Sequence, residues 1–170
     1  MTEKVLSRLS SVSGLKAAAS DYAATGLSID VTADAGNYRD AVKALRELEF
    51  LIESLTAVDA KPQMMVLGHF VRTDVFCRVA VRLLIDRENP SCPSIQDLYP
   101  GANWHERETH DFFGITFAGH PDLTPLILPE DAGDLHPLLK NEKNLKDLGD
   151  VVPAFKAAAP APEAKPEVEK

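Results

Sequence analysis

Residues 105–111, with the sequence His-Glu-Arg-Glu-Thr-His-Asp, gather histidines and carboxylates, the side chains that bind metals and transfer protons. Zinc hydrolases with an HExxH motif place two histidines four residues apart, so that both face one ion. Here His105 and His110 are five residues apart, about 500° of helical rotation, so they cannot share an ion. Glu106 and His110 have suitable spacing, but two ligands make a weak site. We predict no catalytic, metal-binding or cofactor-binding residue, with a stand-alone metal-dependent hydrolase as a distant alternative.

Two His-Pro pairs follow, at 120–121 and 136–137. Each is typical of a turn in which the imidazole ring bonds to backbone groups and the proline fixes φ. The only cysteines, Cys77 and Cys92, lack the paired spacing and number of ligands that a zinc site or an iron-sulfur cluster needs. We expect both to be reduced thiols, with Cys77 in the core.

The composition narrows the class of protein further. A net charge of -8 over 170 residues argues against a nucleic-acid partner, which requires clustered Lys and Arg. No apolar run is long enough to span a membrane. Glycine-rich phosphate-binding loops and nucleophile motifs are absent from the sequence, so a binding or scaffold module is favoured over an enzyme.

These residues must be positioned by a small domain of mixed structure. Helical periodicity predicts a helix over 2–12, and a second helix begins at Asn37, where Asp40 three residues later suggests a capping box. Apolar alternation and β-branched residues predict four strands, over 27–31, 50–58, 64–71 and 75–85. Thr73-Asp74 is expected to join the last two in a hairpin, with Arg78 and Arg82 opposite the buried face.

After Asn89, prolines interrupt any long regular element except one short helix over about 103–112. The segment 114–140 keeps many apolar residues on an extended backbone, so it must lie across a surface, either of its own domain or of a partner. The fold class is therefore α+β: a small mixed sheet with an amphipathic helix, an extended Pro-rich docking segment and a disordered tail. The predicted divisions are an N-terminal helical segment 1–26, an α+β domain 27–100, a signature helix with docking segment 101–150, and a tail 151–170.

The stretch ERETHDFFGITFAGHPDLTPLILPED, followed by HPLLK, resembles the signature of the 30 kDa (C-type) subunit of respiratory complex I, a family that includes related subunits of energy-converting membrane-bound nickel-iron hydrogenases. The resemblance implies a cofactor-free assembly subunit with no catalytic centre of its own, in the peripheral arm of an NADH:quinone oxidoreductase-type complex. The equivalent subunit of a membrane-bound hydrogenase is the alternative. The implied docking residues are Glu106, Arg107, Glu108, Asp111, Gly114, His120, Pro121, Pro129, Glu130, Asp131, His136, Pro137 and Lys140. Of these, Glu106, Arg107, Glu108 and Asp111 are expected to pair with basic groups of the partner.

The resemblance further implies which neighbours the chain has. They are a large subunit (49 kDa-like or hydrogenase-large-like) and a small iron-sulfur subunit, which carry the iron-sulfur clusters and the flavin or nickel-iron centre of the complex. The expected location is cytoplasmic, peripheral on the inner face of the cell membrane. Departures from the family pattern point to a partner surface different from the usual one; they are His110, Thr124-Pro125, Ala132, Leu139 and Asn141.

Overall fold

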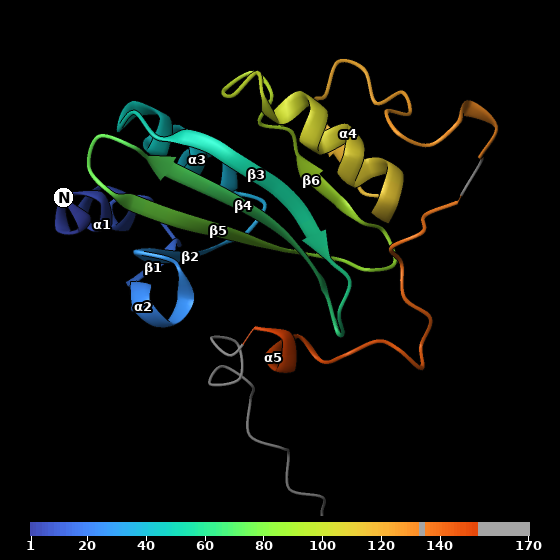
Figure 1. Cartoon of the computed structure of the whole chain (residues 1–170), viewed down its shortest axis with the longest axis horizontal. Coiled ribbons are helices and arrows are strands. Elements are labelled where there is room, and N and C mark those ends of the chain that lie inside the picture. The colour runs from blue at the N-terminus through green and yellow to red at the C-terminus, as the bar shows by residue number, and fades with distance from the viewer. Residues whose placement is uncertain (133–134, 153–170) are drawn as a thin grey trace, which may run out of the picture.

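A five-stranded sheet with the strand order β1-β2-β5-β4-β3 forms the body of the protein (Figure 1). The computed structural model describes residues 1–132 and 135–152. The strands of this sheet are β1 (Lys16–Ala19), β2 (Ile29–Ala33), β3 (Leu51–Val58), β4 (Met64–Arg72) and β5 (Cys77–Ile85). The predicted α+β class is confirmed.

The central strand β5 shows why this sequence forms a sheet. Its odd-numbered residues from Cys77 to Ile85 are all buried, at most 4% exposed, as period-two alternation requires for a strand with one face on the core. Arg78 and Arg82 point to the opposite face, where Arg82 is paired with Asp30 of β2 at 2.7 Å. The strand pairs parallel with β2 and antiparallel with β4, which confirms the predicted hairpin.

Two helices, α1 (Thr2–Ser10) and α3 (Tyr38–Glu47), cover one face of the sheet. Their apolar stripes include Val5, Leu9, Tyr38, Val42 and Leu45, which are all fully buried. Burial of each such side chain stabilises the fold by about 1.5–3 kcal/mol. Cys77 and Cys92 are buried free thiols, as expected for Cys77.

The predicted capping box at the start of α3 is wrong. Asn37 makes no side-chain bond to the first turn of the helix; its side-chain oxygen accepts the backbone N–H of Asp34 instead. The carboxylate of Asp34 accepts the N–H groups of Gly36 and Asn37, so a local Asx-type turn organises the helix entry. The edge strand β1 was not predicted, because its Lys-Ala-Ala-Ala sequence has neither alternation nor β-branched residues.

A second, smaller pair of strands follows the main sheet: β6 (Ser91–Pro93) and β7 (Thr116–Ala118) run parallel. Between them lies α4 (Ala102–Phe113), the predicted short helix, which packs beside β3. Ala102 and Phe113 belong to the same core as α1 and α3. A single turn, α2 (Tyr22–Thr25), and a 3-10 turn, η1 (Glu130–Ala132), complete this part of the chain.

The last described element, α5 (Leu148–Val151), covers part of the other face of the sheet. Leu148 and Val152 pack there against Ala60 and Met65. Val151 and Val152, which the composition assigned to a disordered tail, are thus ordered by apolar contacts; the rest of that tail, 153–170, lies outside the described residues. No helix within 1–132 or 135–152 is long and apolar enough to cross a membrane.

Candidate functional site

The proline-rich segment after β7 lies along α4 and is bound to it by side chains of the helix (Figure 1). We call its described residues, 119–132 and 135–140, the strap. The strap starts near Glu106 on the second turn of α4, passes Arg107 and Asp111, and reaches the end of the helix at Gly114. An extended segment with few backbone partners of its own is therefore positioned by polar groups of one helix.

Asp111 provides the tightest of these attachments. Its Oδ2 accepts the backbone N–H groups of Leu126, Ile127 and Leu128 at 2.9, 2.8 and 3.2 Å. The residue is only 4% exposed. Burial by itself raises the pKa of Asp111, but the three backbone donors outweigh it and hold the pKa below its ordinary value. Asp111 thus acts as an internal anion that fixes the middle of the strap.

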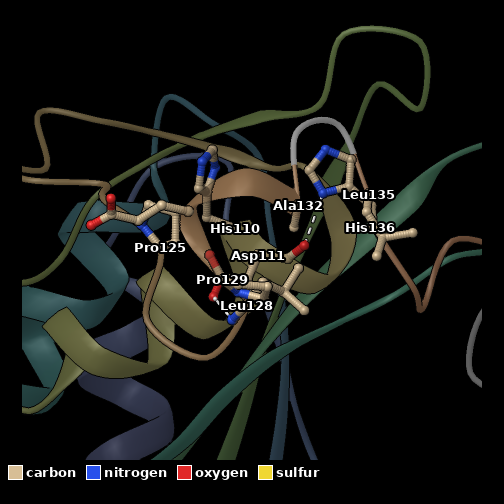
Figure 2. A pocket seen from close by; sticks show the side chains of 9 residues that line it. His110, Asp111, Pro125, Leu128, Pro129, Ala132, Leu135 and His136 are labelled. Carbon is tan, nitrogen blue, oxygen red and sulfur yellow. Dashed lines mark hydrogen bonds between the residues drawn. The ribbon is translucent and has the colours of Figure 1, made fainter.

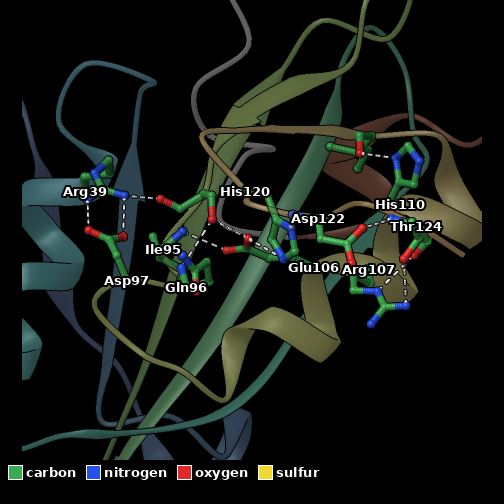
Figure 3. A network of polar contacts seen from close by, with 12 residues as sticks. Arg39, Ile95, Gln96, Asp97, Glu106, Arg107, His110, His120, Asp122 and Thr124 are labelled. Carbon is green, nitrogen blue, oxygen red and sulfur yellow. Dashed lines mark hydrogen bonds and ion pairs between the residues drawn. The ribbon is translucent and has the colours of Figure 1, made fainter. Parts of the chain in front are cut away.

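Arg107, four residues earlier on α4, binds the preceding part of the strap. Its guanidinium donates to the carbonyl oxygens of Thr124 and Pro125, each at 2.9 Å, and to the Thr124 hydroxyl at 3.2 Å (Figure 3). The planar, forked geometry of a guanidinium suits such a set of acceptors. Thr124-Pro125, which departs from the family pattern, is accordingly an acceptor for the Arg107 of the signature.

At the end of α4 the strap packs against the helix C-terminus. The Nδ1 of His136 lies 2.8 Å from the Asp111 carbonyl oxygen, and Leu138 donates its N–H to the Phe112 carbonyl. Because a carbonyl only accepts, Nδ1 of His136 carries the proton. Gly114 ends the helix with a φ of 70°, and a Cβ there would lie 2.8 Å from the His136 ring. The His136 prediction, of a ring bonded to backbone, is confirmed.

The far end of the strap is attached to the main sheet through Asp59, which follows β3. This carboxylate is 1% exposed and accepts the N–H of Lys140 at 2.8 Å and the guanidinium of Arg87 at 2.9 Å. Sequence reasoning missed both Asp59 and Arg87. Their only local signal is a position in loops, and the contacts to Lys140 are long-range.

Glu106 faces the interior rather than the strap surface. It is fully buried; Oε2 accepts the Ser94 hydroxyl at 2.6 Å and Oε1 accepts the N–H of Ile95 at 2.7 Å (Figure 3). Burial raises the pKa of Glu106, and these two donors reduce the rise without cancelling it. The same loop is held by Arg39, which donates to the Ser94 carbonyl and pairs with Asp97.

The expectation that Glu106 and Asp111 pair with basic groups of a partner is therefore corrected. Both carboxylates are buried, and their oxygens are used within the chain. Of the signature's acidic residues on α4, only Glu108 is partly exposed. Its contact with a partner stays a prediction, as do those of the exposed strap residues Pro121, Pro129, Glu130, Asp131, Pro137 and Lys140.

The outward side of the strap and α4 is unusually apolar. Large apolar side chains there are half or more exposed: Trp104 67%, Ile127 56%, Leu135 56%, with Leu138 at 49% and Leu139 at 42% close behind. We call these five residues the outer apolar face. Single exposed apolar residues are common on proteins, but a run of them on one segment marks a surface that binds another protein.

A small pocket lies under the strap beside the end of α4. Its volume is about 60 Å³, and its lining includes His110, Asp111, Leu128, Leu135 and His136 (Figure 2). Small-molecule sites are usually several times larger. The Nδ1 of His110 faces the Ile115 carbonyl oxygen at 3.0 Å. Within the described part of the chain, no three His, Cys, Asp or Glu side chains gather as metal ligands.

The family described as the 30 kDa subunit of respiratory-chain NADH dehydrogenase matches residues 31–147, which include β2 to β7, α4 and the strap. The chain belongs to this family. The match starts within β2 and so leaves α1 and β1 outside the family region. The resemblance given by the signature on α4 and the strap is confirmed.

Relatives in the 30 kDa subunit family share the central part of the chain. The C-type subunit of the NADH-quinone oxidoreductase of a Roseiflexus species is 42% identical over 109 residues, which are 60% of this chain and 62% of that one. The corresponding subunit of Moorella thermoacetica is 36% identical over 102 residues, 59% of this chain and 68% of that one. The chain thus spans about three fifths of the length of the Roseiflexus relative.

Solved structures of similar shape extend the comparison. A trypsin-resistant fragment (1-134) of Nqo5 superposes with a TM-score of 0.59 at 26% identity, over 72% of this chain and all of that one. A chain of a membrane-bound sulfane sulfur reductase, an archaeal respiratory membrane complex, gives a TM-score of 0.70 at 24% identity over 98% of both chains. The second likeness concerns the fold alone.

Proposed function

We propose that this chain is an assembly subunit in the peripheral arm of a membrane-bound redox complex of the NADH:quinone oxidoreductase type. In this role it holds no redox centre, and it docks on neighbouring subunits through the outer apolar face. The iron-sulfur clusters and the flavin lie in those neighbours. Within such a complex the chain lies on the inner face of the cell membrane.

The outer apolar face carries the proposal. The strap directs its polar backbone groups inward, toward Asp111 and Arg107, and leaves Ile127, Leu135 and Leu138 outside. The polar attachments fix the shape of this surface before any partner binds, so that little ordering entropy is lost on docking. A segment built for the chain's own core would have the reverse arrangement.

The partner surface must complement this face. Apolar side chains of the partner would cover the leucines, while basic groups at the rim would face Glu108, Glu130 and Asp131, whose side chains lie around the strap and α4. The family points to a large, 49 kDa-like subunit as the principal neighbour and a small iron-sulfur subunit as the second. Both assignments rest on relatives named as subunits of NADH-quinone oxidoreductases.

Co-purification tests the proposal in the organism that makes the complex. An affinity tag on this chain would recover its neighbours from detergent-solubilised membranes, and mass spectrometry would quantify them. The double variant Ile127→Lys with Leu138→Lys should weaken docking about 100-fold, or about 2.7 kcal/mol, because two apolar contacts are lost and positive charge is placed against a basic rim.

Phe76→Lys is the matched control. Phe76 is 74% exposed at the tip of the β4–β5 hairpin, distant from the strap (Figure 1). It should recover the same subunits as the unmodified chain. Equal recovery of iron-sulfur subunits by the double variant, with its fold intact by circular dichroism, would contradict the proposal.

A further inference from the structure

The imidazole of His120 is buried beside Glu106 with one ring nitrogen unused. Its side chain is 0% exposed, and Nε2 lies 4.0 Å from the Glu106 Oε2, too far for a hydrogen bond (Figure 3). The other ring nitrogen, Nδ1, lies 3.1 Å from the backbone nitrogen of Asp122 and accepts its N–H. In the neutral ring the proton is therefore on Nε2, and it points toward a carboxylate that it does not reach.

An unpartnered N–H inside a protein disfavours the folded state, so this arrangement is unusual. It differs from His136, whose proton is donated to a carbonyl, and from His110, which also faces one. His120 is the residue at which the strap leaves β7 and first meets α4. The polarity of this one contact therefore bears on whether the start of the strap stays on the helix.

The charges around the pair leave Glu106 short of a positive partner. From α3, Arg39 faces it but is already bound to Asp97 in the loop after β6. Tyr38 of α3 and Cys92 of β6 also face it, and burial raises the pKa of both, so they stay neutral. The hydroxyl of Ser94 and the N–H of Ile95 are neutral donors.

On the strap side, the nearest charged group to the ring besides Glu106 is Asp122, whose carboxylate accepts the Thr124 N–H. The ring of His120 is thus placed between two carboxylates. A proton gained by the ring from solvent would give it a positive charge that faces both. An imidazole ordinarily exchanges that proton near neutral pH.

We propose that Glu106 and His120 form a proton-operated latch between α4 and the start of the strap. When the ring takes up a proton at Nδ1, it loses the bond from the Asp122 N–H and becomes an imidazolium facing the buried Glu106 carboxylate. A charge pair in a buried setting is stronger than one neutral hydrogen bond, so the ring moves toward Glu106 and the strap closes. Loss of the proton reopens the 4.0 Å gap. This inference concerns the isolated chain and does not depend on the proposed docking function.

Hydrogen exchange of the full chain over pH 5.5–8.5 tests the latch, after correction for the intrinsic exchange rate at each pH. Backbone amides of 119–124 should be about tenfold more protected at pH 6 than at pH 8, because the closed strap is favoured only while the ring is protonated. Glu106→Gln and His120→Gln should each give a flat profile. A glutamine side chain at position 106 can still accept from Ile95 and donate to the Ser94 oxygen, so the first variant is expected to fold.

His69→Gln is the control, because His69 is another partly buried histidine, bonded to Ser54 on the uncovered face of the sheet. It should keep the wild-type slope. A second readout follows the His120 ring nitrogens directly by NMR: the Nε2 signal should shift with pH in the wild type, and its midpoint should fall in Glu106→Gln. A flat wild-type exchange profile, or a slope and a midpoint that survive Glu106→Gln, would overturn the latch.

Discussion

The Oδ2 atom of Asp111 lies 2.8 Å from the backbone nitrogen of Ile127, and the same oxygen accepts from the residues on either side. The Asp111 carboxylate is buried, whereas the Ile127 side chain is 56% exposed. One residue thus faces inward to fix the backbone, and the other is held outward by that backbone. This division explains how a proline-rich segment with little regular structure can present a defined surface.

Asp111→Asn should loosen the strap without unfolding the sheet. The amide retains one oxygen but no charge, so the three bonds from Leu126, Ile127 and Leu128 weaken, at a cost of about 1–3 kcal/mol. Limited proteolysis of the full chain should cut within 120–130 faster in this variant. Asp131→Asn, which changes an exposed carboxylate in the same segment, should match the wild type. Equal cleavage of the two variants would contradict this role of Asp111.

The same variant should also change the response to acid. The folded-state pKa of Asp111 is lowered, so its contribution to stability is present above about pH 4, the ordinary range of an Asp carboxyl, and is lost as the pH falls through the lowered value. The difference in unfolding free energy between wild type and Asp111→Asn should therefore shrink on acidification. Urea denaturation at pH 7 and at pH 3 measures it; a difference that grows at pH 3 would show that the carboxylate is not held by these donors.

Gly114→Ala should be the most damaging small substitution in the signature. At a φ of 70° an alanine costs about 1–2 kcal/mol in backbone strain, and its Cβ would lie 2.8 Å from the His136 ring. Gly119→Ala separates the two effects, since its φ is 86° but nothing lies within 4 Å of the added Cβ. Urea denaturation should show a larger loss for Gly114→Ala. Equal losses would mean that the His136 ring moves freely.

Glu106→Gln reports on the buried carboxylate itself. Burial raises the folded-state pKa of Glu106, so its favourable contribution is complete below about pH 4, the ordinary range of a Glu carboxyl, and is lost as the pH rises through the raised value. Glutamine does not titrate. The stability of the wild type relative to Glu106→Gln should therefore fall between pH 4 and pH 7. A relative stability that rises over this range would indicate that a cation, not the neutral donors, balances Glu106.

The sequence predicted the parts of the fold that follow from local periodicity. The alternation in β5, the apolar stripe of α3 and the short helix before Gly114 each show a regular pattern of burial, and the structure confirms all three. The strand β1 and the β6–β7 pair were missed, because three or four residues carry too little pattern. The α3 cap failed because Asp34, outside the expected box, competes for the same donors.

The direction of the signature side chains could not be predicted from the sequence. Asp and Glu on a helix are usually exposed, so Glu106 and Asp111 were expected to face a partner. Their burial depends on donors that lie 11 to 17 residues away along irregular chain: the Ser94–Ile95 loop and the amides of the strap. The residue types that make the signature recognisable are thus those that hold the strap in place, while its outer apolar face is formed by ordinary leucines.

The outer apolar face is tested most directly by photo-crosslinking in intact membranes. A photoreactive amino acid replaces Ile127, Leu138 or, as a control, Phe76, one at a time in the full chain. The docking proposal predicts crosslinks from positions 127 and 138 to another subunit of the complex and none from position 76. Crosslinks from position 76 alone would contradict it.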